Sequence, residues 1–260
     1  MDNDGNWDFY MCRLDDKPAF IFLPLDLLKQ DPPVAKYPHL LLVRLHFLHP
    51  REDGLSSQEE FDTLVAIEDA VQEALTAEQA AIYAGRVTTD GYRAFVFYTS
   101  APERSEEQVA RVMRGFAAYE YEASTRPDEN WDFYREFLYP APRQMESVQN
   151  RRVLASLEKN GDALKQGREI DHWAYFPTAE ARDRFVQRAL ELGYALRPDG
   201  DSKADRGFLA RMFRVDVPSY ANIDGVTWPL HEAATEAGGE YDGWESPVIR
   251  PPDLTSPPPT

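Results

Sequence analysis

The sequence is poor in the residues that crosslink a small protein or hold a metal ion. Its 260 residues include a single cysteine, Cys12, so an internal disulfide framework and a zinc site with several thiolates are both excluded. It also lacks a G-x-S-x-G motif and a glycine-rich phosphate loop, two common signatures of catalysis. We therefore expect no cofactor and no catalytic residues, and we interpret Cys12 as an inert thiol.

Basic residues are in a minority. The chain has 28 Lys and Arg against 45 Asp and Glu, a formal net charge of −17. Because such an excess repels phosphates, it argues against direct binding to nucleic acid or to an anionic membrane. The most apolar run, residues 39–48, is too short to span a bilayer and contains Arg44. The acidic N-terminus lacks the basic start of a secretory signal, so we expect a cytoplasmic protein.

His46 and His49 are the one pair of histidines close enough in the sequence to suggest two ligands of one metal ion. In a strand, however, side chains three positions apart lie on opposite faces of the sheet, so the two imidazoles are not expected to share an ion. The sequence therefore predicts no metal site.

Apolar residues make up 43% of the chain and aromatic residues 12%, which is enough for a substantial core. Charge divides the chain: residues 1–140 carry 26 acidic and 13 basic side chains, and residues 141–260 carry 19 and 15. Two prolines just after Tyr139 interrupt regular structure at this point. We predict one domain over residues 1–140, a second over 141–249, and a disordered proline-rich tail over 250–260.

Hydrophobic periodicity predicts the same order of elements in both halves. The first half has expected strands at residues 7–14, 19–25, 39–47, 82–87, 92–99 and 119–123, and helices that begin at the capping boxes Ser57-x-x-Glu60 and Ser105-x-x-Gln108. The second half has expected helices at 143–164, 178–193 and 219–237, strands at 172–176, 194–197, 208–217 and 241–248, and a turn at 199–202. Pro229 either kinks the last helix, which we favour, or begins a second short one. Apart from the N-terminal hairpin and the long helix at 143–164, each half follows the order β-α-β-β-α-β. We predict an α+β protein of two ferredoxin-like antiparallel α/β sandwich domains in tandem.

One pentapeptide occurs twice. The first copy runs from Asn6 to Tyr10, and the identical residues return from Asn130 to Tyr134. We interpret both copies as edge-strand packing units, with the aromatic rings inward and the acid outward.

Two groups of residues are candidates for a binding site. One is a segment that combines aromatic anchors with acids, as protein interfaces often do: Glu240, Tyr241, Asp242, Trp244 and Glu245. The other is a set of charged residues that either line a ligand pocket or hold the structure together: Arg86, Arg93, Arg168, Asp171 and His172. For the last three, the structural alternative is a buried hydrogen-bonded charge cluster where a strand begins.

Several stretches resemble known families. The second half resembles the regulator of ribonuclease E activity B family through His172-Trp173-x-Tyr175-Phe176, the helix end at Gly193, the acidic linker around Asp199, and Gly239-Glu240-Tyr241-Asp242-Gly243-Trp244. The first half resembles domain of unknown function 695 through Trp7-x-Phe9-Tyr10, Lys17-Pro18-Ala19, Asp53-Gly54-Leu55, Ile67-Glu68, Gly85-Arg86-x5-Gly91-Tyr92-Arg93 and Phe97-Tyr98.

The resemblance to the regulator family implies a ferredoxin-like fold and a small acidic protein, not an enzyme, that binds ribonuclease E and restrains it. The leading hypothesis is thus a non-catalytic acidic protein that contacts a basic segment of ribonuclease E or a related RNA-processing enzyme. One alternative is a small-molecule sensor or enzyme with a pocket between the two domains. Another is a homo-oligomeric structural protein that associates through sheet edges.

Overall fold

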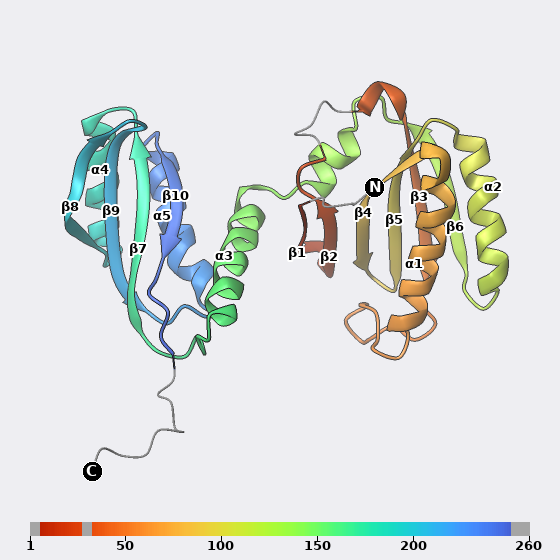
Figure 1. Ribbon diagram of the computed structural model, residues 1–260, viewed down its shortest axis with the longest axis horizontal. Coiled ribbons are helices and arrows are strands. Elements are labelled where there is room, and N and C mark those ends of the chain that lie inside the picture. The colour runs from red at the N-terminus through yellow and green to blue at the C-terminus, as the bar shows by residue number, and fades with distance from the viewer. Residues whose placement is uncertain (1–5, 28–32, 251–260) are drawn as a thin grey trace, which may run out of the picture. The chain divides into compact units, whose positions relative to one another are not determined.

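The computed structural model describes residues 6–27 and 33–250, and the chain divides into two compact units, an N unit (residues 1–144) and a C unit (residues 145–260) (Figure 1). Each unit combines helices with one antiparallel sheet, so the protein is α+β. Of the tail predicted at 250–260, all but Arg250 lies outside the described residues. In the described part of the chain, the helices are too short or too polar to cross a membrane.

The N unit is built on a six-stranded sheet with the order β1-β2-β4-β5-β3-β6. Its strands are β1 (Trp7–Leu14), β2 (Lys17–Pro24), β3 (His39–His46), β4 (Ala81–Thr89), β5 (Tyr92–Thr99) and β6 (Tyr121–Pro127). Its helices are α1 (Phe61–Thr76) and α2 (Pro102–Met113), with shorter helical turns at Pro33–Lys36, Ala77–Gln79, Arg114–Phe116 and Phe133–Leu138. The β1–β2 hairpin pairs with β4 and widens the sheet, as its pattern predicts.

Both tight hairpins of this sheet turn on two residues with positive φ. Asp15 and Asp16, at φ 47° and 62°, join β1 to β2. Asp90 and Gly91, at φ 42° and 82°, join β4 to β5, between the strands predicted at 82–87 and 92–99. Positive φ at both central residues gives the turn a twist that matches the strands, and Asp and Gly tolerate it well.

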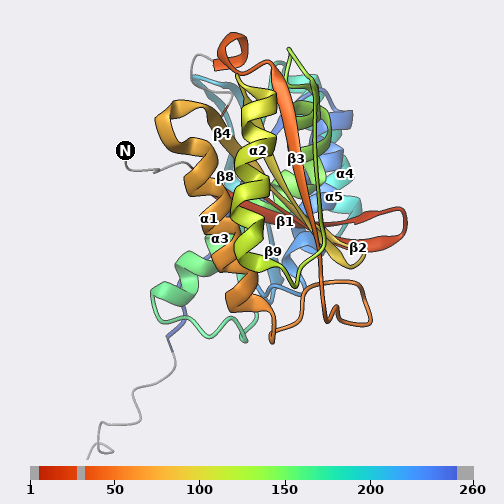
Figure 2. The same cartoon turned by 90° about the vertical axis from the view of Figure 1, so that its right-hand side faces the viewer.

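Helices α1 and α2 lie side by side over one face of the sheet (Figure 2). The core beneath them is formed by alternate residues of the central strands and one stripe of each helix: Leu41, Val43, Leu45, Phe95 and Phe97 from the sheet, Leu64, Ile67 and Val71 from α1, and Val109 and Met113 from α2. The alternation follows from the two-residue period of a strand.

The opposite face of the N-unit sheet is covered by the segment that follows β6. The Trp131 ring stacks on Tyr98 of β5 with centroids 4.0 Å apart, and its Nε1 donates to the carbonyl of Tyr37 at 3.0 Å. The prediction that the repeated pentapeptide forms two edge strands is therefore wrong for the second copy, which enters a helical turn at Phe133. The two copies instead lock together: the Tyr10 hydroxyl donates to the carbonyl of Leu138, and the Tyr134 hydroxyl donates to that of Pro24.

Both predicted capping boxes are wrong. Helix α1 begins one residue after Glu60, whose carboxylate accepts the backbone N–H groups of Leu48 and His49, each at 2.8 Å, instead of capping the helix. Ser105 lies inside α2, which begins at Pro102. Proline suits the first helical position because its missing N–H would have no partner there.

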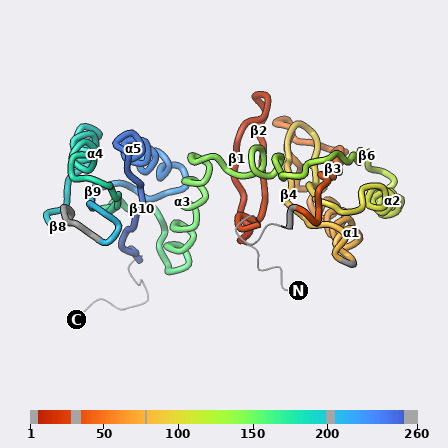
Figure 3. Tube along the Cα trace, turned by 90° about the horizontal axis from the view of Figure 1, so that it is seen from above, coloured from red at the N-terminus to blue at the C-terminus, as the bar shows by residue number. Residues whose placement is uncertain are grey.

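The C unit carries a four-stranded antiparallel sheet with the order β10-β7-β9-β8. Its elements are α3 (Pro142–Lys159), β7 (Arg168–Phe176), α4 (Ala179–Glu191), β8 (Ala195–Ala204), β9 (Gly207–Asp216), α5 (Ile223–Glu236) and β10 (Glu240–Glu245). Helices α4 and α5 cover one face (Figure 3), and their contacts with the sheet come mainly from buried Phe185, Val226 and Leu230.

Two local predictions for the C unit are wrong. The turn between β8 and β9 lies at Asp205 and Arg206, not at 199–202, because the strand continues through the polar stretch that the sequence had suggested as a loop. Residues 219–222 precede α5, which begins at Ile223 and runs through Pro229 to Glu236.

Candidate functional sites

The segment Glu240–Glu245 forms β10, the outer strand beside β7. Its pairing with β7 shifts between Tyr241 and Gly243, a β-bulge that leaves Asp242 as the extra residue, and Gly243 adopts φ 120°. Simple alternation would send Tyr241 and Trp244 to opposite faces. The bulge turns both aromatic side chains into the core instead.

The rings of Tyr241 and Trp244 are both part of the hydrophobic core of the C unit. Trp244 is 8% exposed, and its Nε1 donates to Asn150 Oδ1 of α3 at 2.7 Å. The amide nitrogen of Asn150 in turn donates to Asp224 and to Thr227 of α5. The indole therefore joins α3, α5 and β10 from inside the C unit, and it is not presented at the surface as an anchor for a partner.

The acids of the same strand do lie at the surface. Arg206 donates to Asp242 at 2.7 Å and to Glu240 at 3.2 Å. Glu245 is exposed at the end of the strand. These carboxylates are the part of the predicted binding segment that can meet another molecule.

Arg168, Asp171 and His172 do not form the single cluster that the sequence suggests. Arg168 pairs with Asp162, and both side chains are buried. The hydrogen bonds from Arg168 lower the pKa of the Asp162 carboxyl to about 2. Asp162 also accepts the N–H of Ile249, so this pair fastens the chain beyond β10 to the end of α3.

His172 lies on the helix-covered face of β7. Its Nδ1 is 2.8 Å from the Tyr241 hydroxyl, and burial lowers the pKa of the imidazole to about 3. The ring is therefore neutral near pH 7, and it serves as a packed core group.

Asp171 points to the other face of the same strand. It accepts a hydrogen bond from Arg197 Nε at 2.6 Å and pairs with Arg211 at 3.3 Å. Side chains at successive strand positions point in opposite directions, which separates Asp171 from His172.

That second face of the C-unit sheet carries three arginines stacked on three aromatic rings. The guanidinium of Arg197 lies 3.9 Å from the Phe213 ring centroid, Arg206 lies 4.3 Å from that of Tyr175, and Arg211 lies 5.0 Å from that of Trp173. We call these six residues the arginine–aromatic face. Neither helix α4 nor α5 covers it, since both pack on the side of Ile170, His172 and Ala174.

The arginine–aromatic face was not predicted from the sequence. The alternation at 171, 173 and 175 against the buried residues 170, 172, 174 and 176 was a usable signal for its β7 side. Its arginines come from β8, the β8–β9 turn and β9, so their convergence depends on the strand register.

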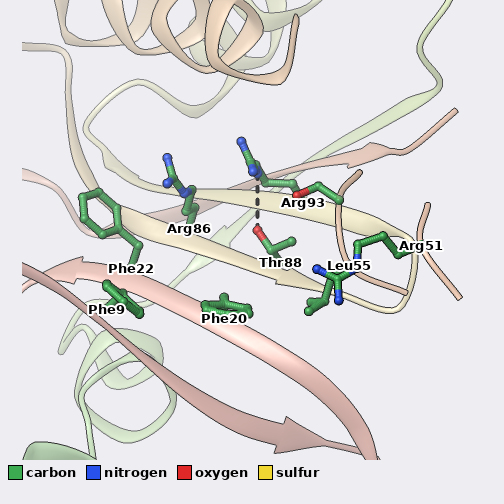
Figure 4. Close-up of a pocket in the computed structure, with 9 residues that line it drawn as sticks. Phe9, Phe20, Phe22, Arg51, Leu55, Arg86, Thr88 and Arg93 are labelled. Carbon is green, nitrogen blue, oxygen red and sulfur yellow. Dashed lines mark hydrogen bonds between the residues drawn. The ribbon is translucent and has the colours of Figure 1, made fainter. Parts of the chain in front are cut away.

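Arg86 and Arg93 lie close together in the N unit, and both line a cavity of about 410 Å³ (Figure 4). Its lining comes from β1, β2, β4, β5 and the loop before α1: Phe9, Phe20, Phe22, Arg51, Leu55, Ser56, Arg86, Thr88 and Arg93. Cross-strand pairing places Phe22 beside Arg86 and Phe20 beside Thr88, so the apolar wall of the cavity lies next to its polar wall on the same face of the sheet.

One carboxylate holds the two arginines of this cavity. Glu68 of α1 is 2.6 Å from Arg86 Nη1 and 3.4 Å from Arg93 Nη1, and it also accepts the Tyr83 hydroxyl at 2.7 Å. Burial, and then the charge of Arg86, lower the pKa of Arg93. Hydrogen bonding and stacking on Phe22 fix Arg86 in place.

The residues considered for nucleophilic or metal chemistry are not brought together. Burial raises the pKa of the Cys12 thiol, which disfavours the reactive thiolate. His46 ends β3 and its Nε2 lies 3.8 Å from Glu122, whereas His49 is in the following loop. Among the described residues, no group of three His, Cys, Asp or Glu side chains is arranged to hold a metal ion.

Comparison with known proteins gives two family matches. Residues 5–139 match a family of unknown function, DUF695, and residues 147–246 match the family Regulator of ribonuclease activity B, RraB. No curated protein matches the chain. Among solved structures, an unknown protein from Galdieria sulphuraria is 12% identical, with 80% of this chain and 99% of that chain covered and a TM-score of 0.21.

Proposed function

We propose that this chain, which belongs to the DUF695 family through residues 5–139 and carries an RraB domain over residues 147–246, regulates a ribonuclease by direct protein contact. The RraB match carries the proposal, because it extends from α3 to β10 and so includes the whole sheet of the C unit. The regulator acts through binding and has no catalytic role.

The arginine–aromatic face is the surface we assign to that contact. Trp, Tyr and Arg are the residues most enriched among those that dominate binding energy in protein interfaces. On this face, stacking and ion pairs already hold the arginine side chains in place, so little side-chain entropy is lost when a partner binds. Trp173 thus takes the role of anchor that the sequence had suggested for Trp244.

Charge favours a basic partner. Three arginines of the face lie among five acids: Glu169, Asp171, Glu240, Asp242 and Glu245. The net negative charge of this surface repels the phosphates of RNA and attracts a basic protein segment. Ribonuclease E, or a related RNA-processing enzyme in the cytoplasm, is the partner that we propose.

We also assign both units to the ferredoxin-like fold. In each, the order β-α-β-β-α-β accompanies a sheet in which the first and third strands are the inner neighbours. In the N unit this core consists of β3 to β6, and the β1–β2 hairpin is an addition.

Cleavage of an RNA substrate by purified ribonuclease E tests the proposal, with the full chain added in increasing amounts. We expect saturable inhibition that weakens as salt rises, because acidic rim residues act through long-range attraction. Capture on the immobilised chain, at low and high salt, measures the contact itself. Cleavage rates that stay unchanged, together with no retention of ribonuclease E at low salt, would refute the proposed function.

Two variants locate the surface. Trp173→Ala should weaken binding by about 30-fold, the effect of losing an interface anchor of about 2 kcal/mol, while Tyr220→Ala, an exposed tyrosine of the same unit, should leave it unchanged. Glu245→Lys should slow association, and Glu191→Lys on α4 is its charge control. If both members of each pair bind alike, the contact lies elsewhere on the C unit.

A further inference from the structure

The cavity of the N unit exists because its sheet is wider than its helix layer. Adjacent strands lie about 4.8 Å apart and a helix is about 10 Å wide, so two helices cover about four strands. Helix α1 packs on β4, and α2 packs on β3 and β6. The outer hairpin therefore extends past α1, and Phe9 and Phe20 lie on the helix-side face of the sheet, beyond the strand on which α1 packs.

The apolar wall of this cavity is only partly closed. Phe22 stacks on Trp7 with centroids 4.8 Å apart and holds Arg86 on its ring. Phe20 and Phe9 are tilted toward each other at 6.0 Å, Phe20 half-buried and Phe9 38% exposed. These rings form an apolar surface that a flat molecule can cover.

The polar wall has a surplus of one positive charge. Arg51 pairs with Asp53 at 2.6 Å, and Arg86 and Arg93 share Glu68, so three guanidinium groups face two carboxylates. Arg86 donates to Glu68 through Nη1, while Arg93 donates to Thr88 through Nε and to Glu68 through Nη1. A guanidinium has five N–H donors, so its other terminal nitrogen can bind a ligand oxygen.

We propose that this cavity is a binding site for a small flat organic monocarboxylate. Its carboxylate binds at the arginine wall and neutralises the surplus charge, and its apolar body covers Phe20 and Phe9. The volume of about 410 Å³ suits a small molecule, since ligand pockets span about 300–1,000 Å³. This site lies in the N unit and makes no use of the arginine–aromatic face, so it is independent of the proposed ribonuclease contact.

The full chain and 2-naphthoate, an aromatic monocarboxylate, test this site by calorimetry and by amide chemical shifts. For a probe of this size, we expect saturable binding with a Kd of about 1 mM or tighter, and shifts centred on β2, β4 and β5. The neutral analogue 2-naphthamide should bind about tenfold more weakly, because it loses the charge-assisted hydrogen bonds.

Matched variants assign the two walls. Arg51→Gln should weaken 2-naphthoate binding about tenfold and leave 2-naphthamide binding unchanged. Its control is Arg44→Gln on β3, whose side chain is 45% exposed against 57% for Arg51. Phe20→Ala should weaken both probes, and Phe61→Ala on α1 should weaken neither. The proposal fails if 2-naphthoate does not saturate, if 2-naphthamide binds equally well, or if each variant behaves like its control. None of these results depends on whether ribonuclease is inhibited.

Discussion

In both units two helices pack on one face of an antiparallel sheet, but the sheets differ in width. The sheet surfaces that remain exposed differ as a result. In the C unit, two helices face four strands, and the helix side is filled by His172, Tyr241 and Trp244. In the N unit, two helices face six strands, and the surplus width becomes a cavity. The number of strands that extend beyond the helix layer thus decides whether the helix-side face of a sheet is entirely core or also lines a cavity.

The two sheets also differ on the face that points away from the helices. The N-unit sheet is closed on its second side by the segment around Trp131, while α4 and α5 leave the second side of the C-unit sheet uncovered. Arginines differ accordingly. On the C unit each of three guanidiniums is stacked and ion-paired, whereas in the N-unit cavity Arg86 and Arg93 share one carboxylate. The first arrangement presents a preorganised surface, and the second leaves charge for a ligand.

The largest expected effect comes from removing the C-unit aromatic that lies inside the core. Trp244→Ala should lower the free energy of unfolding of the C unit by about 3–5 kcal/mol, because it opens a cavity and leaves Asn150 without its donor. Hydrogen exchange followed by mass spectrometry should show faster exchange in the C unit, with the N unit unchanged. Ordinary protection in the C unit of this variant would mean that the indole does not join its elements.

An intermediate effect is expected on acidification. The folded-state pKa of His172, about 3, is below its unfolded value near 6.5, so the unfolded state binds the extra proton between these two values. The stability that this imidazole contributes is full above pH 6.5 and is lost as the pH falls, at about 1.4 kcal/mol per pH unit. Denaturant unfolding from pH 7 to pH 4.5 measures the slope for the C unit. His172→Asn should flatten that slope, and an equal slope in the variant would assign it to other groups.

The smallest effect is expected in the N-unit cavity wall. Phe20→Ala should cost less than about 1 kcal/mol, because the ring lines a cavity and is not sealed in the core. Thermal unfolding of this variant beside Phe97→Ala, a fully buried ring of the same sheet, tests the difference. Similar losses in both would show that the cavity wall is part of the core.

Much of the fold follows from local patterns in the sequence. Alternation predicts the order of the strands correctly, since two-residue periodicity is a local property. The bounds of β6, β8 and β10 differ from the expected 119–123, 194–197 and 241–248. The start of α4 was predicted correctly, since Thr178 caps it. The start of α1 was wrong because Ser57 and Glu60 have a capping pattern, yet Glu60 binds the N–H groups of Leu48 and His49. A rule based on residue spacing cannot show that a side chain binds a distant backbone group in preference to the end of its own helix.

The candidate sites were harder to predict because they depend on register. The bulge at Asp242 reverses the direction of Trp244, and one extra residue is enough to move a side chain to the other face. Asp171 meets Arg197 only because β8 and β9 bring together residues 26 positions apart. The family resemblance, by contrast, was confirmed over both halves, because it rests on residue patterns alone.

The paired tyrosines of the repeated pentapeptide set an order on the assembly of the N unit. Tyr10 binds a carbonyl 128 positions later, and Tyr134 binds one 110 positions earlier. During synthesis the first hairpin leaves the ribosome long before the segment that supplies Tyr134 and the Leu138 carbonyl exists. Contacts of such long sequence separation form late and slowly. The N-terminal hairpin therefore cannot make these hydrogen bonds until residue 138 has emerged. The last segment of the N unit completes the packing of its first two strands.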